Sequence, residues 1–288
     1  MSRSIPSLVF LSLLVLLGAL PRCASAAASY DTCKGFITSL PATVDTAGTW
    51  CLKQDLSTAI SSGNAIQINS DNVTIDCNGY KLGGLAAGES TLATGIDSFD
   101  HRNITIRRCN IRGFSYGIVL SGSSLAVGGQ LIEDNRFDSN TNYAILLYGN
   151  GSMIRRNQIN DTGFVTVDGG GEAIYVSGWV DIIDNTVAGV TATASYGSRG
   201  IETYLDDGSI IGNRVSGVRG NSSTYSTGIF AGTSHGTVRD NTISGTNTGY
   251  QYGIYCSNNG AVAKDNEINN MGTALTNCSD GGGNDIGS

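Results

Sequence analysis

Two stretches near the C-terminus carry the pattern that decides the fold: GIFAGTSHGTVRDNTI at residues 228–243 and GIYCSNNGAVAKDNEI at residues 253–268. Each opens with glycine and isoleucine and places an asparagine thirteen residues after the glycine, at Asn241 and Asn266. Short β-branched runs alternate with Gly, Asn, Ser and Asp, which is typical of short strands joined by tight turns. The pattern therefore predicts a repeating unit of strands and turns.

The same unit recurs along most of the chain. A small residue followed by an apolar residue marks successive copies, which lie 21 to 30 residues apart. The nine pairs are Ala65-Ile66, Gly95-Ile96, Gly117-Ile118, Ala144-Ile145, Ala173-Ile174, Gly200-Ile201, Gly228-Ile229, Gly253-Ile254 and Ala274-Leu275. The asparagine stays in phase with this pair, and no segment shows the sustained apolar spacing of three and four residues that a helical solenoid needs. We therefore predict a β-solenoid.

Each copy is interpreted as one coil of three short strands. A single coil cannot bury its apolar face, so coils stack in parallel register about 4.8 Å apart with their apolar side chains inward. The repeated asparagine is expected at a sharp turn, where Asn tolerates unusual φ and its amide bonds to the coils above and below. This structural ladder is predicted to consist of Asn135, Asn157, Asn185, Asn213, Asn241 and Asn266.

The DNxI…GI coils resemble the right-handed parallel β-helix repeats of the pectin-lyase-like superfamily over about residues 60 to 280. The resemblance implies an all-β, single-stranded right-handed parallel β-helix of about nine three-strand coils over residues 64–288. Residues 27–63, which include TWCLKQDL, resemble the N-terminal cap of such chains, and a cap covers the open edge of the first coil. The superfamily includes lyases, hydrolases, epimerases and non-catalytic proteins, so the resemblance implies no single activity.

The first 26 residues are interpreted as a signal peptide. Arg3 supplies a positive start, residues 8–20 are mostly apolar, and Ala24-Ser25-Ala26 offers a small-x-small cleavage pattern. The apolar run is too short to span a bilayer. We therefore expect a secreted or periplasmic protein.

Six cysteines remain after cleavage, and an even number in an exported chain indicates disulfides. They are Cys33, Cys51, Cys77, Cys109, Cys256 and Cys278. Six cysteines allow fifteen connectivities, and zinc is disfavoured because C-x-x-C and Cys/His clusters are missing. On the β-helix that the resemblance implies, the pairs join near neighbours: Cys33–Cys51 in the cap, Cys77–Cys109 flanking the asparagine turn, and Cys256–Cys278 in equivalent strands of the last two coils.

The charge of the chain limits its partners. The formal net charge is −7, and removal of Arg3 and Arg22 with the signal peptide makes it −9. An acidic chain without a basic cluster is a poor candidate for binding nucleic acid or an anionic membrane. A polyanionic sugar is also disfavoured unless cations bridge it to the protein. We expect a monomer.

The strands that contain the Gly-Ile pairs are expected to present an aromatic surface. If the isoleucine points inward, alternate residues point outward, and five rings then lie on one outer face: Tyr148, Tyr175, Tyr204, Phe230 and Tyr255. Aromatic side chains on an otherwise polar surface suit the apolar faces of sugar rings, so we interpret these residues as polysaccharide-binding. The alternative is that they reflect β-propensity and cross-strand packing alone.

One turn offers candidate catalytic residues. Asp207 lies seven residues after Gly200 and His235 lies seven residues after Gly228, so the two are expected in equivalent turns of adjacent coils. Asp206 and Glu202 lie beside them, and two carboxylates with a histidine suit general acid–base cleavage of a glycosidic bond. The pieces Asp-Asp-Gly and Ser-His-Gly faintly resemble polygalacturonase motifs, but the remaining motifs are missing. Solvated turn residues are the alternative.

No cofactor is expected, with calcium as the one candidate. Asp168 and Glu172 are candidates to ligate it together with Glu202, although three scattered carboxylates are few for calcium.

Two classes of function remain open. The first is a protein that interacts with an extracellular polysaccharide, as a binder, lyase or hydrolase. The second is a non-catalytic structural or adhesive surface protein. The aromatic residues and the Asp/His turn favour the first, and the missing catalytic motifs favour the second.

Overall fold

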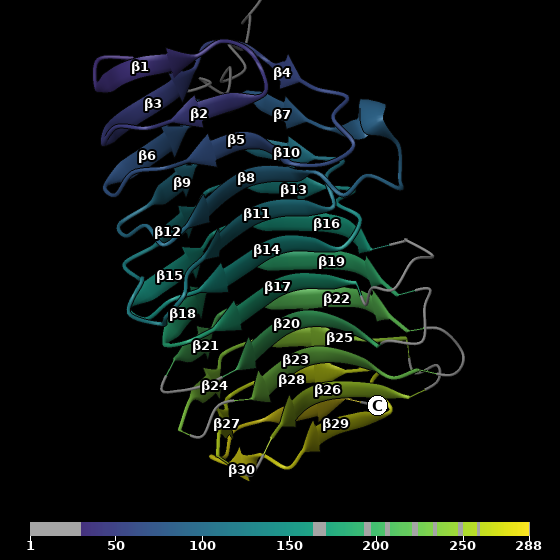
Figure 1. The fold of residues 1–288 in the computed structure, drawn as a ribbon. Coiled ribbons are helices and arrows are strands. Elements are labelled where there is room, and N and C mark those ends of the chain that lie inside the picture. Colours follow the sequence, from purple (N-terminus) through teal and green to yellow (C-terminus); the bar gives the residue numbers. More distant parts are fainter. Residues whose placement is uncertain are drawn as a thin grey trace, which may run out of the picture.

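The computed structural model describes residues 30–163, 171–192, 197–204, 208–220, 224–232, 235–246, 250–257 and 260–287. The predicted signal peptide, residues 1–26, lies outside the described residues. The described chain winds through three parallel sheets whose strands stack from β1 at one end to β30 and β31 at the other (Figure 1). We call the three sheets A, B and C. Successive strands along the chain pass from sheet B to sheet A to sheet C, so the hydrogen-bonded neighbours of each strand come from adjacent coils.

Three lists give the bounds of the strands. Sheet A contains β1 (Cys33–Ile37), β3 (Gly48–Leu52), β6 (Val73–Asp76), β9 (Thr105–Arg107), β12 (Leu131–Glu133), β15 (Ser152–Arg155), β18 (Val180–Ile183), β21 (Ser209–Ile211), β24 (Thr237–Arg239), β27 (Val262–Lys264) and β30 (Ser279–Asp280). Sheet B contains β2 (Ala42–Val44), β5 (Asn64–Ile68), β8 (Thr94–Phe99), β11 (Tyr116–Ser121), β14 (Tyr143–Tyr148), β17 (Glu172–Ser177), β20 (Ser198–Tyr204), β23 (Ser226–Gly232), β26 (Gln251–Cys256) and β29 (Thr273–Thr276). Sheet C contains β4 (Leu56–Ser57), β7 (Lys81–Gly83), β10 (Asn110–Arg112), β13 (Arg136–Asp138), β16 (Gln158–Gly163), β19 (Thr186–Thr191), β22 (Arg214–Arg219), β25 (Thr242–Ser244), β28 (Glu267–Asn269) and β31 (Asp285–Gly287). One short 3₁₀ helix, η1 (Leu85–Ala87), follows β7.

The predicted fold class is confirmed. Each of the nine Gly/Ala–apolar pairs lies in a strand of sheet B, from β5 to β29. The apolar residues of these pairs are register partners from Ile66 to Leu275, so they form one continuous inner column. The isoleucines in this column are fully buried, and burial stabilises the fold by about 1.5–3 kcal/mol for each such side chain.

The asparagine ladder also forms as predicted. The backbone N–H and the side-chain amide of each asparagine both donate to Oδ1 of the next one, over 2.8–3.1 Å. Asn284 accepts the same pair of bonds from Asn266 and is a further member that the repeat pattern missed. Because buried polar groups are costly unless they are bonded, the ladder fixes the register of the stacked coils.

One detail of the turn prediction is wrong. The left-handed conformation belongs to the residue before the ladder asparagine, as at Asp134 (φ 55°), Asp184 (φ 54°) and Asp240 (φ 57°). The asparagine must point into the stack to bond to its neighbours, so the bend falls on the preceding residue, and Asp tolerates this region of φ better than most residues.

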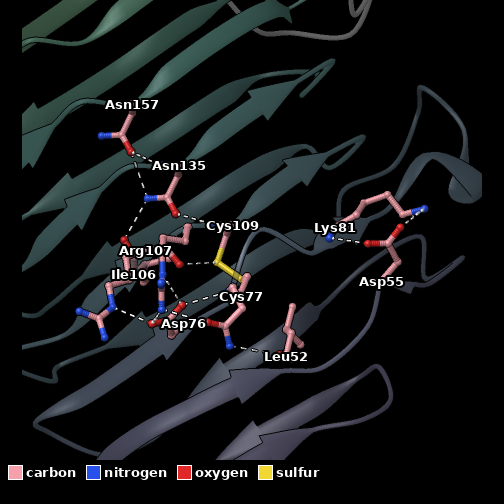
Figure 2. Close-up of a disulfide and its surroundings, with 12 residues drawn as sticks. Leu52, Asp55, Asp76, Cys77, Lys81, Ile106, Arg107, Cys109, Asn135 and Asn157 are labelled. Atoms are coloured by element: carbon pink, nitrogen blue, oxygen red, sulfur yellow. Dashed lines mark hydrogen bonds and ion pairs between the residues drawn. A yellow bond between two sulfur atoms is a disulfide. The ribbon is translucent and has the colours of Figure 1, made fainter. Parts of the chain in front are cut away.

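The three predicted disulfides are present: Cys33–Cys51, Cys77–Cys109 and Cys256–Cys278. Figure 2 shows that Cys109 occupies the first position of the asparagine ladder, because its N–H donates to Oδ1 of Asn135 over 3.0 Å. One prediction needs correction: Cys278 lies two residues after β29, not within the strand equivalent to that of Cys256. The bond still forms because the two Cα atoms are 5.0 Å apart. Three disulfides are typical of a chain that folds in an oxidising compartment.

Candidate functional site

The outer face of sheet B brings the predicted aromatic residues together. Tyr175, Glu202, Phe230 and Tyr255 are successive register partners in one outward column. Tyr148 and Tyr204 lie in the next outward column, two residues further along their strands, with Ser177 between them. The alternation inferred from the inward isoleucines therefore assigns every one of these positions correctly.

A third outward column, two residues before the isoleucines, was missed by the sequence reasoning. It contains Tyr116, Tyr143, Glu172, Arg199 and Tyr252, with Thr227 between the last two. The same alternation predicts this column when it is applied toward the N-terminal end of each strand. This column supplies three more rings, together with Arg199, which bonds to Glu202, and Glu172, which bonds to Arg199.

The rings form one unbroken series of contacts across the sheet. We call it the aromatic face and define it as Tyr116, Tyr143, Tyr148, Tyr175, Tyr204, Phe230, Tyr252 and Tyr255. Neighbouring ring centroids are 5.3–5.9 Å apart, which is the spacing of favourable aromatic pairs. All eight side chains are half-buried, so each ring is packed against its neighbours and still exposes part of its surface.

A buried ionic cluster lies among these rings. Arg199 Nη1 donates to Glu202 Oε2 over 2.7 Å and to Glu172 Oε1 over 3.3 Å. Glu202 is 1% exposed and Glu172 is 6% exposed. The Arg199 guanidinium also lies over the ring of Phe230, 5.0 Å from its centroid, a favourable cation–π position. The cluster therefore links the charged residues to the rings that surround them.

The environment of the cluster favours a neutral carboxyl at Glu172. Burial and the Glu202 carboxylate together raise the pKa of Glu172 to about 9, against the opposing effect of Arg199. Burial also raises the pKa values of Tyr143 and Tyr175. At neutral pH the aromatic face thus presents uncharged hydroxyl groups, and Glu172 is protonated.

We expect the free energy of unfolding to decrease between pH 4.5 and about 9 because of Glu172. Its pKa is higher in the folded chain than in the unfolded chain, so the folded state binds more protons in this interval. That contribution is fully present below the unfolded pKa and is lost as the pH rises through the folded pKa. Glu172→Gln retains an uncharged polar side chain and should flatten the decrease by at least about 1 kcal/mol, the value of roughly one pKa unit. Urea denaturation at several pH values measures it; parallel curves for the variant and the parent would contradict the assignment.

A pocket of about 250 Å³ opens at one end of the aromatic face. It is lined by Tyr225, Thr227, Phe230, Tyr252 and Tyr255. Tyr225 extends the ring series, with its centroid 6.3 Å from that of Tyr252. A lining of aromatic rings together with tyrosine and threonine hydroxyl groups suits a sugar ring, which has apolar faces and polar edges.

The predicted catalytic residues are only partly placed. Asp206 and Asp207 lie outside the described residues, so the structure does not bear on their proximity to His235. His235 is exposed and lies in the connection from β23 to β24. Glu202 is buried and bonded to Arg199, and its acid–base role stays a prediction.

The predicted calcium ligands have other partners or are not placed. Asp168 lies outside the described residues, and Glu172 and Glu202 share Arg199. Among the residues that the structure describes, no group of three or more His, Cys, Asp or Glu side chains is arranged to hold a metal ion. Within the same ranges, no helix is long and apolar enough to cross a membrane.

Comparison with known proteins identifies similarity of fold. The family described as "Right handed beta helix region" matches residues 53–199. The structure is similar to that of the Dettilon tailspike protein gp208, with a TM-score of 0.54 and 16% sequence identity. The similarity covers 88% of this chain and 60% of the tailspike chain, so this chain spans less than two thirds of that protein. No curated protein sequence matches the chain.

Proposed function

Because the chain belongs to the family of right-handed β-helix proteins, we propose that it binds an extracellular polysaccharide along the outer face of sheet B. One observation carries the proposal: eight half-buried rings make a continuous series of contacts over the strands from β11 to β26. A surface of this length suits several consecutive sugar units, each stacked on exposed ring area.

The proposal includes export of the protein. A signal peptide at residues 1–26 directs the chain out of the cytoplasm, and residues 27–63 act as the N-terminal cap of the β-helix. The three disulfides support this location because they persist in an oxidising compartment.

Binding, rather than cleavage, is the function proposed. Glu202 already has a cationic partner and is buried. Binding on the aromatic face needs no residue that cleaves a glycosidic bond, because ring stacking suffices for recognition of the sugar.

Affinity electrophoresis tests the proposal. The mature protein is run through native gels that contain one polysaccharide each, drawn from a panel of plant, fungal and bacterial glycans. We expect retardation by at least one glycan, with a dissociation constant in the micromolar to millimolar range. Unretarded migration in every gel would refute the proposal and favour the structural role as a surface or spacer protein.

A further inference from the structure

We propose that the aromatic face takes an uncharged glycan and discriminates against carboxylated or sulfated ones. This inference rests on the function proposed above and specifies the class of its ligand. It follows from where the cations of the chain lie, from the state of the single cation at this face, and from the kind of hydrogen-bonding groups that surround the rings.

The cations lie almost entirely on the other two sheets. Arg199 is the one Lys or Arg residue in any strand of sheet B that the structure describes, whereas the same strands contain Asp97, Glu172 and Glu202. The other described Lys and Arg residues that lie in strands belong to sheets A and C. They are Lys34, Arg107, Arg155, Arg239 and Lys264 in sheet A, and Lys81, Arg112, Arg136, Arg214 and Arg219 in sheet C. Among the described strands of sheet B, a carboxylated glycan would therefore meet no cation other than Arg199.

The segments outside the described residues add no cation to this part of the chain. Between residues 164 and 259 these segments contain Asp168, Asp206 and Asp207 and no Lys, Arg or His. They therefore add only acidic residues to the part of the chain that includes β17 to β26.

The single cation of the face is already neutralised. Arg199 bonds to Glu202 and Glu172, and its side chain is 17% exposed. Capture of a ligand carboxylate would require Arg199 to give up a bond to a buried glutamate, and leaving a buried charge without a partner is costly. Arg199 therefore supports the rings, through Phe230, more readily than it binds an anion.

The other polar groups of the face are uncharged. The tyrosine hydroxyls donate and accept hydrogen bonds, and burial raises the pKa of Tyr204 to about 12, so it stays protonated at neutral pH. Sugar hydroxyls are matching neutral donors and acceptors, and they give up less hydration energy than a carboxylate does on binding. Ring stacking and neutral hydrogen bonds together define an uncharged glycan as the ligand.

Matched pairs of glycans test this inference. Each pair shares one backbone and differs in charge: hydroxyethyl cellulose and carboxymethyl cellulose, dextran and carboxymethyl dextran, and methyl-esterified and de-esterified polygalacturonate. For any backbone that binds, we expect the uncharged member to bind about tenfold or more tightly at 0.01 M salt, with a smaller ratio at 0.1 M because the Debye length falls from roughly 30 to 10 Å. Tighter binding of the carboxylated member would overturn the inference but leave the proposed function intact. Binding to no glycan of any kind would overturn both.

A double variant gives an independent test by gain of binding. Glu172→Gln with Glu202→Gln removes the Glu202 carboxylate and the Glu172 carboxyl group from Arg199 and keeps the size of the side chains. We expect the preference for the uncharged member to fall by about tenfold or more, since an unneutralised guanidinium binds carboxylates strongly.

The matched control is Glu133→Gln. Glu133 is a buried glutamate on sheet A that bonds to Arg155 and Arg156, so this variant also releases arginine from a carboxylate, away from the aromatic face. We expect its glycan preference to equal that of the parent. An equal change in both variants would show that net charge, rather than the aromatic face, sets the selectivity. If the double variant does not fold, the ratio measured for the parent chain still decides the inference.

Discussion

Replacement of Asn213 by alanine is expected to lower the free energy of unfolding by about 3–5 kcal/mol. The Asn213 side chain donates to the carbonyl of Ile182 over 2.8 Å and to Oδ1 of Asn241, and its own Oδ1 accepts from the N–H and amide of Asn185. The residue is fully buried, so alanine leaves several polar groups without partners and opens a small cavity. Urea denaturation measures the change.

Asn160→Ala is the matched control for this prediction. Asn160 lies in β16 and is half-buried, and its side chain donates a hydrogen bond to Asp138 over 3.2 Å. We expect the control to lose about 1 kcal/mol or less. Equal losses at the two positions would mean that the ladder adds nothing beyond ordinary polar contacts.

The double variant Tyr175→Ala with Tyr204→Ala is expected to weaken binding of the retained polysaccharide about a hundredfold. The two rings are 5.7 Å apart at the centre of the aromatic face. A loss of about 1.4 kcal/mol for each ring corresponds to tenfold in affinity, and the two losses multiply. Both rings are half-buried on the outer side of the sheet, so the inner apolar column and the ladder stay intact and the variant should fold.

Tyr80→Ala serves as the control for the double variant. Tyr80 is also a half-buried tyrosine, but it lies between β6 and β7, away from sheet B. We expect its affinity for the glycan to equal that of the parent, with circular dichroism confirming that all variants are folded. Unchanged binding in the double variant would remove the central rings from the site.

The fold was largely predictable because its determinants are local and repeated. The Gly-Ile pairs and the asparagines recur in phase, so the position of each coil can be predicted from the preceding one. The cysteine pairings follow from the same register. Asparagine tolerates left-handed φ, but this preference did not predict that the residue before each ladder asparagine adopts it. The side-chain amide of the asparagine must form hydrogen bonds along the stack, and this requirement overrides the preference.

The sequence predicted which aromatic residues face outward at the candidate site, but not which charged side chains pair with each other. Tyr175 and Tyr255 follow from alternation along a strand, which is a property of the backbone. The cluster of Glu172, Arg199 and Glu202 depends on which side chains of two adjacent coils reach each other, and alternation assigns a face without assigning partners. For the same reason Glu202 resembled an exposed acid in the sequence although it is a buried partner of Arg199.

Hydroxyl-radical footprinting tests the central claim, that a polysaccharide lies on the aromatic face of sheet B, most directly. Oxidation of each tyrosine is measured by mass spectrometry with and without the glycan that retards the protein in gels. The account predicts protection of Tyr148, Tyr175, Tyr204 and Tyr255, with Tyr30 and Tyr80 unchanged. Unaltered oxidation of those four residues in the presence of a saturating glycan, with protection elsewhere on the chain, would contradict it.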